Sequence, residues 1–303
     1  MKRLLAFLLK VFRDAFASAN GGGIFVQSAA LSYYTVFAIA PLFIIVLAIA
    51  GLWFGQEAAQ KQLFGQLSEM VGTEGGEAIQ AVVAAARHHQ AGIWATLVAV
   101  GTLFAASTAV FVQLQDSLNL IWRVEPPAHR GLKDLVRHRI VSFAMILGIG
   151  FLLLVSLIIS SFLATMTQLF GTLVSNKDAV LSALNFFVSL GIITLLFTLI
   201  LKVLPDVKMG WKPPFLGGFL TAILFNVGKF LFSIYIGHSS IVSVYGAMGS
   251  LVVILLWVYY SAQILLFGAH FTKVLTKRTE GTPLPTRDAT PIKGAQDATI
   301  RAA

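Results

Sequence analysis

One cation inside an apolar stretch is the residue of this chain best suited to chemistry. Lys229 lies beyond the midpoint of the apolar segment Phe215–Gly237, and Asn226 and Ser233 share its helical face at positions i−3 and i+4. A lysine at the centre of a lipid-facing helix costs about 2.5–3.5 kcal/mol, so we expect this polar stripe to face the interior of a helix bundle. There the ammonium group can attract an anion or bond backbone carbonyls as a purely structural group; alternatively, it snorkels to a membrane surface.

Residues that support metal, redox or nucleophilic chemistry are sparse. The sequence has no cysteine, which excludes thiolate zinc sites, iron–sulfur clusters and cysteine nucleophiles. The adjacent histidines His88 and His89 diverge by about 100° on a helix, so they do not face one metal ion. No glycine-rich phosphate loop precedes a Lys-Ser or Lys-Thr pair. The sequence therefore predicts no catalytic residue, metal site, cofactor or nucleic-acid partner, and we expect no enzyme.

The composition is that of an integral membrane protein. Hydrophobic residues make up 57% of the 303 residues and charged residues 12%, whereas soluble domains have about 45–50% and about 25%. The mean hydropathy is +0.83. Six apolar stretches are long enough to cross a bilayer core of about 30 Å as helices. Because the sequence lacks strand-like alternation, it predicts an all-α, polytopic membrane protein with six transmembrane helices. The six stretches are Tyr33–Gly55, Gly92–Leu114, Ile140–Met166, Val180–Leu204, Phe215–Gly237 and Gly246–Phe271.

The positive charges outside these stretches predict an orientation. Most of the 22 lysines and arginines lie in the N-terminal segment, in the loops after the second and fourth stretches, and in the C-terminal tail. The intervening loops hold only Lys61, Arg87 and Lys177. Under the positive-inside rule, both termini are expected in the cytoplasm.

The segments that flank the predicted spans carry weaker patterns. Residues 1–19 place Leu5, Leu8, Phe12 and Phe16 on one helical face, opposite basic residues, which favours a cytoplasmic amphipathic surface helix over a cleaved signal peptide. The loop 56–91 has two apolar stripes around a glycine-rich break and predicts an outer helical hairpin. The proline-containing tail 276–303 is expected to be disordered, which leaves residues 1–275 as a single transmembrane domain.

A proline and two tyrosines complete the candidate site. Pro41 cannot donate a hydrogen bond to the Phe37 carbonyl, so a kink is expected in the first span. Kinked helices often line cavities, but proline is also common in ordinary spans, and both interpretations stay open. Tyr33 and Tyr34 supply hydroxyls near the cytoplasmic entrance. The predicted cavity is lined by Lys229, Asn226, Ser233, Pro41, Tyr33 and Tyr34.

Four motifs follow one another between residues 24 and 275. They are Ala29–Phe37 leading to Pro41, Gln115–Trp122, Leu204-Pro205-Asp206 with Lys208 and Trp211, and the run from Tyr245 to Ala269. In this order they resemble the YihY/BrkB family of bacterial inner-membrane proteins. The resemblance implies a six-helix inner-membrane protein with cytoplasmic ends. Its motif residues here are Asp116, Asn119, Tyr245, Gly246, Trp257, Gly268 and His270. His270 stands where the family usually has glutamate, so a role of that carboxylate does not transfer to this chain.

The resemblance implies little about chemistry. Some family members have carried the label ribonuclease BN, the BrkB name refers to resistance to serum killing, and transport has been suggested. We predict a transporter or exporter of an anionic or amphiphilic solute, lipids included, that is surrounded by membrane lipids. The alternative is a non-transporting scaffold for envelope integrity. A membrane-bound ribonuclease is least favoured, because no metal or carboxylate cluster is present to activate water.

Overall fold

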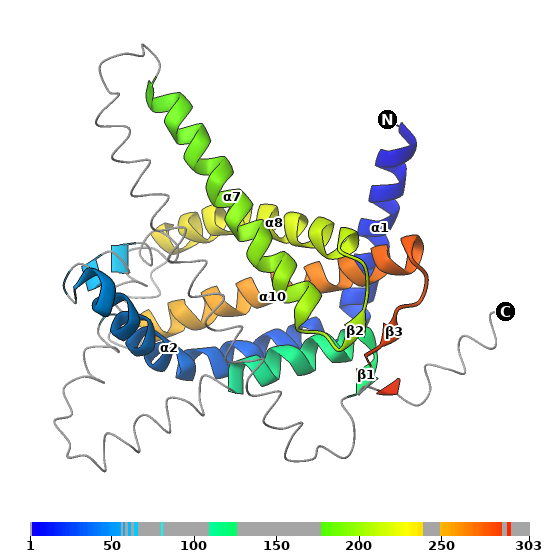
Figure 1. The fold of residues 1–303 in the computed structure, drawn as a ribbon, viewed down its shortest axis with the longest axis horizontal. Helices are drawn as coiled ribbons and strands as arrows, with labels where there is room; N and C mark the ends of the chain where they lie inside the picture. The colour runs from blue at the N-terminus through cyan, green and yellow to red at the C-terminus, as the bar shows by residue number, and fades with distance from the viewer. Residues whose placement is uncertain are drawn as a thin grey trace. The chain divides into compact units, whose positions relative to one another are not determined.

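The computed structural model describes residues 2–55, 57, 60–61, 64–65, 80, 109–125, 177–238, 249–286 and 290–291. Its helices are α1 (Lys2–Gly21), α2 (Ile24–Phe54), α7 (Lys177–Val203), α8 (Lys212–His238) and α10 (Gly249–Thr279), and residues 109–122 are also helical (Figure 1). The short strands are β1 (Val124–Glu125), β2 (Val207–Lys208), β3 (Leu284–Pro285) and β4 (Thr290–Pro291). The predicted third span, most of the second and most of the outer hairpin lie outside the described residues.

Three of the described helices are long and apolar enough to cross a membrane. These segments are Phe186–Val203 in α7, Lys212–Phe232 in α8 and Val252–Thr279 in α10. They correspond to the predicted fourth, fifth and sixth spans. The first predicted span, except its last residue Gly55, lies within α2, which continues through Pro41 as helix. The Pro41 side chain lies outside the described residues, so the kink stays a prediction. The described chain is thus mostly helical, and the count of six spans remains an expectation.

The chain divides into two compact units, which are described separately. Unit 1 comprises Met1–Phe16, Leu118–Ile223 and Gly268–Ala303, and unit 2 comprises Ala17–Ser117 and Leu224–Phe267.

In unit 1, α8 and α10 cross through reciprocal Gly–Thr contacts. A Cβ atom on Gly217 would lie 1.9 Å from Thr272 Oγ1, and one on Gly268 would lie 1.9 Å from Thr221 Oγ1. Each threonine hydroxyl donates back to its own helix, Thr221 to the Gly217 carbonyl at 2.7 Å and Thr272 to the Gly268 carbonyl at 2.8 Å. The hydroxyls are therefore satisfied while they fill the notches left by the facing glycines.

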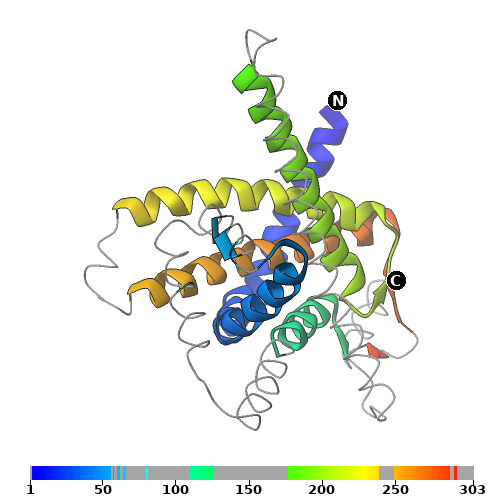
Figure 2. The same ribbon diagram turned by 60° about the vertical axis from the view of Figure 1, so that its left-hand side comes forward.

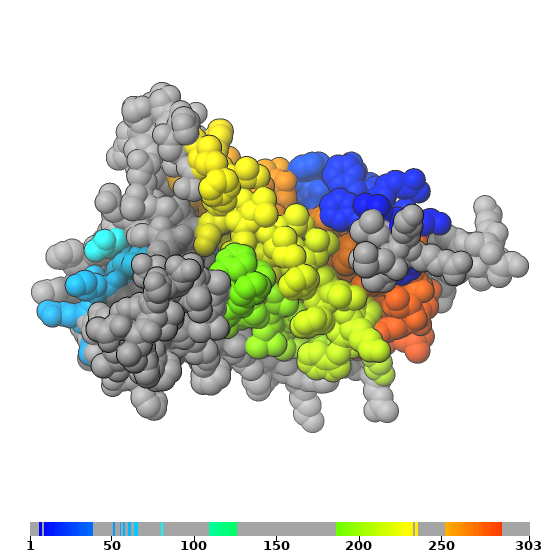
Figure 3. All heavy atoms as spheres, turned by 90° about the horizontal axis from the view of Figure 1, so that it is seen from above, coloured from blue at the N-terminus to red at the C-terminus, as the bar shows by residue number. Residues whose placement is uncertain are grey.

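A similar contact joins α7 to α8 in the same unit. A Cβ on Gly218 would lie 2.4 Å from Thr198 Oγ1, and this hydroxyl donates to the Thr194 carbonyl at 2.7 Å. α7 passes across α8 in Figures 1 and 2, and the side chains of the two helices lie side by side in the space-filling view of Figure 3. Small residues and inward-facing hydroxyls thus set the close approach of these two helices.

The C-terminal part of unit 1 contains two short antiparallel strand pairs. β2 pairs with β3 and β1 pairs with β4. Residues 276–303 are expected to be disordered, whereas the structure continues α10 to Thr279 and places Leu284–Pro285 and Thr290–Pro291 in these pairs. Beside the strands, Trp122, Val124, Val207 and Met209 form a buried cluster. These pairings give backbone groups of the two tail segments partners on residues 207–208 and 124–125, while the disorder expected for the rest of the tail falls outside the described residues and stays a prediction.

In unit 2, aromatic contacts join the second half of α8 to the first half of α10. The Trp257 ring centroid lies 5.6 Å from that of Phe225 and 5.0 Å from that of Phe232. Between these two phenylalanines, a Cβ on Gly228 would lie 2.5 Å from Cε1 of Tyr260. This face of α8 is thus packed against α10.

Candidate functional site

Lys229 lies at the edge of the packed face of α8. Its neighbour Gly228 is buried against Tyr260, whereas Val227 and Phe230 are 50% and 65% exposed. Lys229 itself is half-buried. Among the residues that the structure describes, it makes no hydrogen bond or ion pair.

The other residues of the predicted cavity are only partly described. Asn226 is half-buried on α8, one turn before Lys229. Tyr33 and Tyr34 are 59% and 40% exposed on α2, where their rings meet edge-to-face at 5.8 Å and Tyr33 also contacts Phe37. The side chains of Ser233 and Pro41 lie outside the described residues. Whether the six residues line one cavity stays a prediction.

A second polar arrangement, in unit 1, joins two of the family motifs. Asn119 Nδ2 donates to Asp206 Oδ2 at 2.9 Å, and the Asp206 backbone N–H donates to Asn119 Oδ1 at 2.9 Å. Asn119 is only 2% exposed. One amide thus satisfies both the side chain and the backbone of a residue 87 positions away in the sequence.

The loop between α7 and α8 is held by further contacts around this pair, and we call the whole arrangement the Asp206 hub. The backbone N–H of Thr286 donates to the Asp206 carbonyl at 3.0 Å, and the Gly210 N–H donates to Glu280 Oε2 at 2.8 Å. Lys202 Nζ donates to the Met209 carbonyl. Because every contact except the bond from Asn119 Nδ2 to Asp206 Oδ2 satisfies a backbone group of the loop, the hub orders the junction between two membrane-length helices.

Three cations gather where helix 109–122 ends. Lys273 on α10 is half-buried and its Nζ donates to the Ile121 carbonyl. Arg123 follows the helix with a φ of 57°, in the left-handed region, and its side chain is exposed. Lys277 lies one turn beyond Lys273 and is exposed as well. Both Arg123 and Lys277 lie close enough to act electrostatically on Lys273.

The remaining motif residues take separate places. Trp257 is buried in unit 2, and Gly268 is in the α8–α10 crossing. His270 is buried at 2% exposure, and Asp116 is exposed on helix 109–122. Tyr245 and Gly246 lie outside the described residues. No group of three His, Asp or Glu residues suited to a metal ion occurs in the described ranges.

Asp206 and Lys273 were not singled out from the sequence. Asp206 belongs to the motif Leu204-Pro205-Asp206. The order of this motif and the Asn119 motif along the chain indicates the family, but it does not indicate that Asn119 and Asp206 are in contact. From the sequence, Lys273 is only one of the cations that follow the last predicted span.

A comparison with known families agrees with the resemblance that the four motifs indicate. The model of the family described as "Virulence factor BrkB" matches residues 15–293. The chain belongs to this family. The UPF0761 membrane protein of Pseudomonas paraeruginosa is 29% identical over 253 residues, which are 80% of this chain and 57% of the relative. A UPF0761 membrane protein of Azotobacter vinelandii is 27% identical over 270 residues, 86% of this chain and 62% of the relative.

A relative from Tolumonas auensis, also a UPF0761 membrane protein, is 32% identical over 163 residues, covering 54% of this chain and 51% of the relative. The BrkB-family chain described here thus spans about three fifths or less of these relatives' lengths. No solved structure matches it. Family membership and the membrane-length helices together establish a membrane protein.

Proposed function

We propose that this BrkB-family protein moves an anionic or amphiphilic solute across or within the membrane, and that Lys229 attracts the solute. The observation that carries the proposal is a half-buried ammonium group in a membrane-length helix, without an ion pair in the described part of the chain. Holding such a group in a lipid-facing helix costs about 2.5–3.5 kcal/mol. A bound anion offsets this cost only while the solute is present, which suits a transit site.

Replacing Lys229 with methionine tests the proposal, because methionine keeps a long side chain without the charge. Purified protein is reconstituted in liposomes, and translocation is followed for fluorescent phosphatidylglycerol and, separately, for entrapped carboxyfluorescein. We expect wild-type protein to move at least one probe and Lys229→Met to lose most of that activity at unchanged abundance. Lys208→Met, which removes an exposed cation between α7 and α8, is the matched control.

The same variant distinguishes transport from a structural role. If Lys229 only holds helices together in a protein that does transport, Lys229→Met leaves translocation at the wild-type level and changes only the melting temperature, whereas a non-transporting envelope scaffold moves neither probe. Full translocation by the variant therefore rejects the role of Lys229. Translocation of neither probe by wild-type protein rejects transport of these two solute classes.

We also infer six spans, an inner-membrane location, cytoplasmic termini and a surface role for α1. In α1, Val11 is fully buried, whereas Phe12 and Phe16 are 40% and 57% exposed and Lys10 and Arg13 are exposed beside them. An exposed apolar strip next to basic residues suits the surface of an anionic leaflet.

The absence of native cysteine makes labelling of single cysteines a direct test of this orientation. Glu57→Cys probes the predicted outer side and Lys277→Cys the predicted cytoplasmic side, and both residues are exposed. A membrane-impermeant maleimide added to spheroplasts should label Glu57→Cys only. Labelling of Lys277→Cys alone means that the orientation is inverted.

A further inference from the structure

Arg123 has a backbone conformation that favours glycine. With a φ of 57°, it is the one non-glycine residue with positive φ among the described residues. Its neighbours Trp122 and Val124 are 7% and 6% exposed and pack with the buried cluster around Val207. Burying both neighbours explains why the chain turns sharply here. It does not explain the arginine, because glycine takes the left-handed conformation after a helix without steric cost.

The surroundings of Arg123 supply a reason for a cation at this position. Lys273 Nζ bonds the Ile121 carbonyl, two residues before Arg123, and Lys277 follows Lys273 at the i+4 position of α10. The three side chains therefore come from two segments that meet at one place in unit 1. No ion pair joins any of them to an acidic residue in the described part of the chain.

The local charge balance leaves this cluster positive. The C-terminal ends of helix 109–122 and of α10 each carry the equivalent of about half a negative charge, and the exposed Glu125 and Glu280 follow Arg123 and Lys277 in the sequence, so the three cations are only partly offset by helix ends while no ion pair neutralises them in the described residues. Like charges held close together repel each other, and backbone strain at one of them adds to the cost. Such an arrangement is stabilised when a multivalent anion binds. A phosphate group fits best, because it offers several acceptor oxygens and matches the planar fork of a guanidinium group.

We propose that Arg123, Lys273 and Lys277 form a binding site for a phosphate-bearing anion, which is either a phospholipid headgroup or a soluble phosphate. The inference deepens the proposed function, because it gives the anionic solute a docking point outside unit 2. The inference rests on the proposed function only where it equates the bound anion with the transported solute. Binding of the anion is measured without transport.

Arg123→Gly is the decisive variant, because it removes the guanidinium and relieves the backbone at the same time. The melting temperature of full-length protein in detergent is measured in chloride alone, with inorganic phosphate at matched ionic strength, and with short-chain phosphatidylglycerol or phosphatidylcholine. Without phosphate, we expect Arg123→Gly to melt about 2 °C above wild-type protein. With phosphate or phosphatidylglycerol, wild-type protein should be stabilised, and the variant should need about tenfold more anion for the same shift.

Matched variants separate a built site from general positive charge. Lys277→Gln removes a cation of the cluster without changing the backbone and should also weaken the response. Lys208→Gln removes an exposed cation elsewhere in unit 1 and should respond like wild-type protein. If Arg123→Gly melts below wild-type protein in chloride, Lys277→Gln alone decides the outcome.

The results also identify the source of the phosphate and separate this site from Lys229. A shift with both inorganic phosphate and phosphatidylglycerol supports a site for any phosphate, and a shift with phosphatidylglycerol alone supports a headgroup site. No shift with either anion overturns the proposal, as does an equal loss of response in Lys208→Gln. Lys229→Met should keep the full response, so a failed transport assay leaves the binding result intact.

Discussion

Replacing Asn119 with alanine should destabilise the protein by about 2–4 kcal/mol. Asn119 is almost fully buried and exchanges two hydrogen bonds of 2.9 Å with Asp206. A hydrogen bond to a charged group contributes about 1.5–3 kcal/mol and one to a neutral group about 0.5–1.5 kcal/mol. The full sum is discounted, because Asp206 is half-buried and water can reach part of its carboxylate. The loss is read from unfolding in mixed micelles of increasing denaturing detergent.

Asn119→Asp is a sharper version of the same perturbation. It keeps the side-chain size and the acceptor for the Asp206 N–H, but it places a second carboxylate where the amide donated to Asp206 Oδ2. Repulsion replaces that bond, so we expect this variant to be less stable than Asn119→Ala. Lys208→Ala, an exposed change in the same loop, should alter the free energy of unfolding by less than about 0.5 kcal/mol.

A double-mutant cycle with Asp206→Ala isolates the interaction, since Asp206 also has other contacts. We expect a coupling energy of about 1.5 kcal/mol or more between positions 119 and 206. The reasoning is refuted if the coupling energy is below about 0.5 kcal/mol, or if the free energy of unfolding of Asn119→Asp equals that of the wild-type protein.

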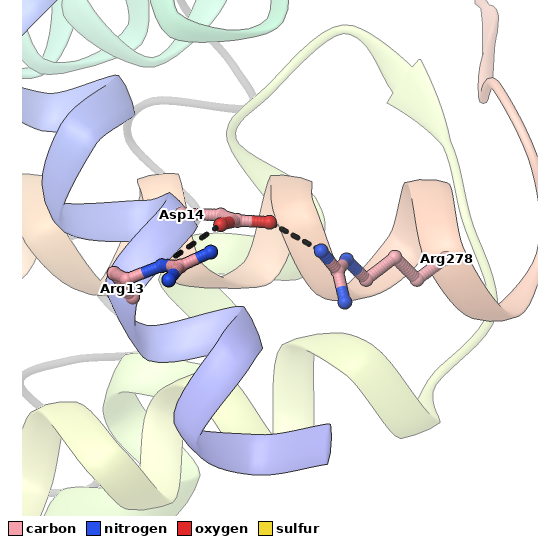
Figure 4. A network of polar contacts seen from close by, with 3 residues as sticks. All are labelled: Arg13, Asp14 and Arg278. Atoms are coloured by element: carbon pink, nitrogen blue, oxygen red, sulfur yellow. Dashed lines mark hydrogen bonds and ion pairs between the residues drawn. The ribbon is translucent and has the colours of Figure 1, made fainter. Parts of the chain in front are cut away.

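Two further predictions concern helix packing and an exposed ion pair. Gly268→Ala places a Cβ 1.9 Å from Thr221 Oγ1 and should lower the free energy of unfolding by about 1–3 kcal/mol. Adding Thr221→Ala should recover part of this loss in the same unfolding assay. The control Gly191→Ala, whose added Cβ has no atom within 4 Å, should be neutral or slightly stabilising. Asp14→Asn removes the ion pairs to Arg278 and, at 3.9 Å, to Arg13 (Figure 4). Because these side chains are partly exposed, the loss should be about 1 kcal/mol or less and should vanish in high salt; a large, salt-independent loss contradicts this view.

The helices could be predicted from the sequence where apolar runs are long. The predicted span Phe215–Gly237 lies inside α8, and Gly246–Phe271 largely coincides with α10. α10 continues beyond the predicted span to Thr279, with Leu275 and Thr276 buried and Lys277 exposed. Helical hydrogen bonds continue beyond the apolar segment, so hydropathy marks the span rather than the helix.

The contacts of the Asp206 hub could not be predicted, because they join distant parts of the chain. Nothing in the spacing of Asn119 and Asp206 indicates that they meet. The strand formed by Leu284 and Pro285 could not be predicted for another reason. A two-residue pairing is made by backbone groups, and the amino-acid composition informs only about side chains. That the polar stripe of Lys229 faces the interior of a helix bundle stays a prediction, and the place of Lys229 beside the packed face of α8 depends on how Phe225 and Phe232 contact Trp257.

The reciprocal Gly–Thr crossing also limits how the molecule can move. Since each hydroxyl sits in the notch of the opposite helix, α8 and α10 cannot slide along one another in unit 1 without steric collision in both directions. A rearrangement of this region therefore has to carry the two helices together, as an interlocked pair, and any relative motion must be taken up by the segments on either side of the crossing.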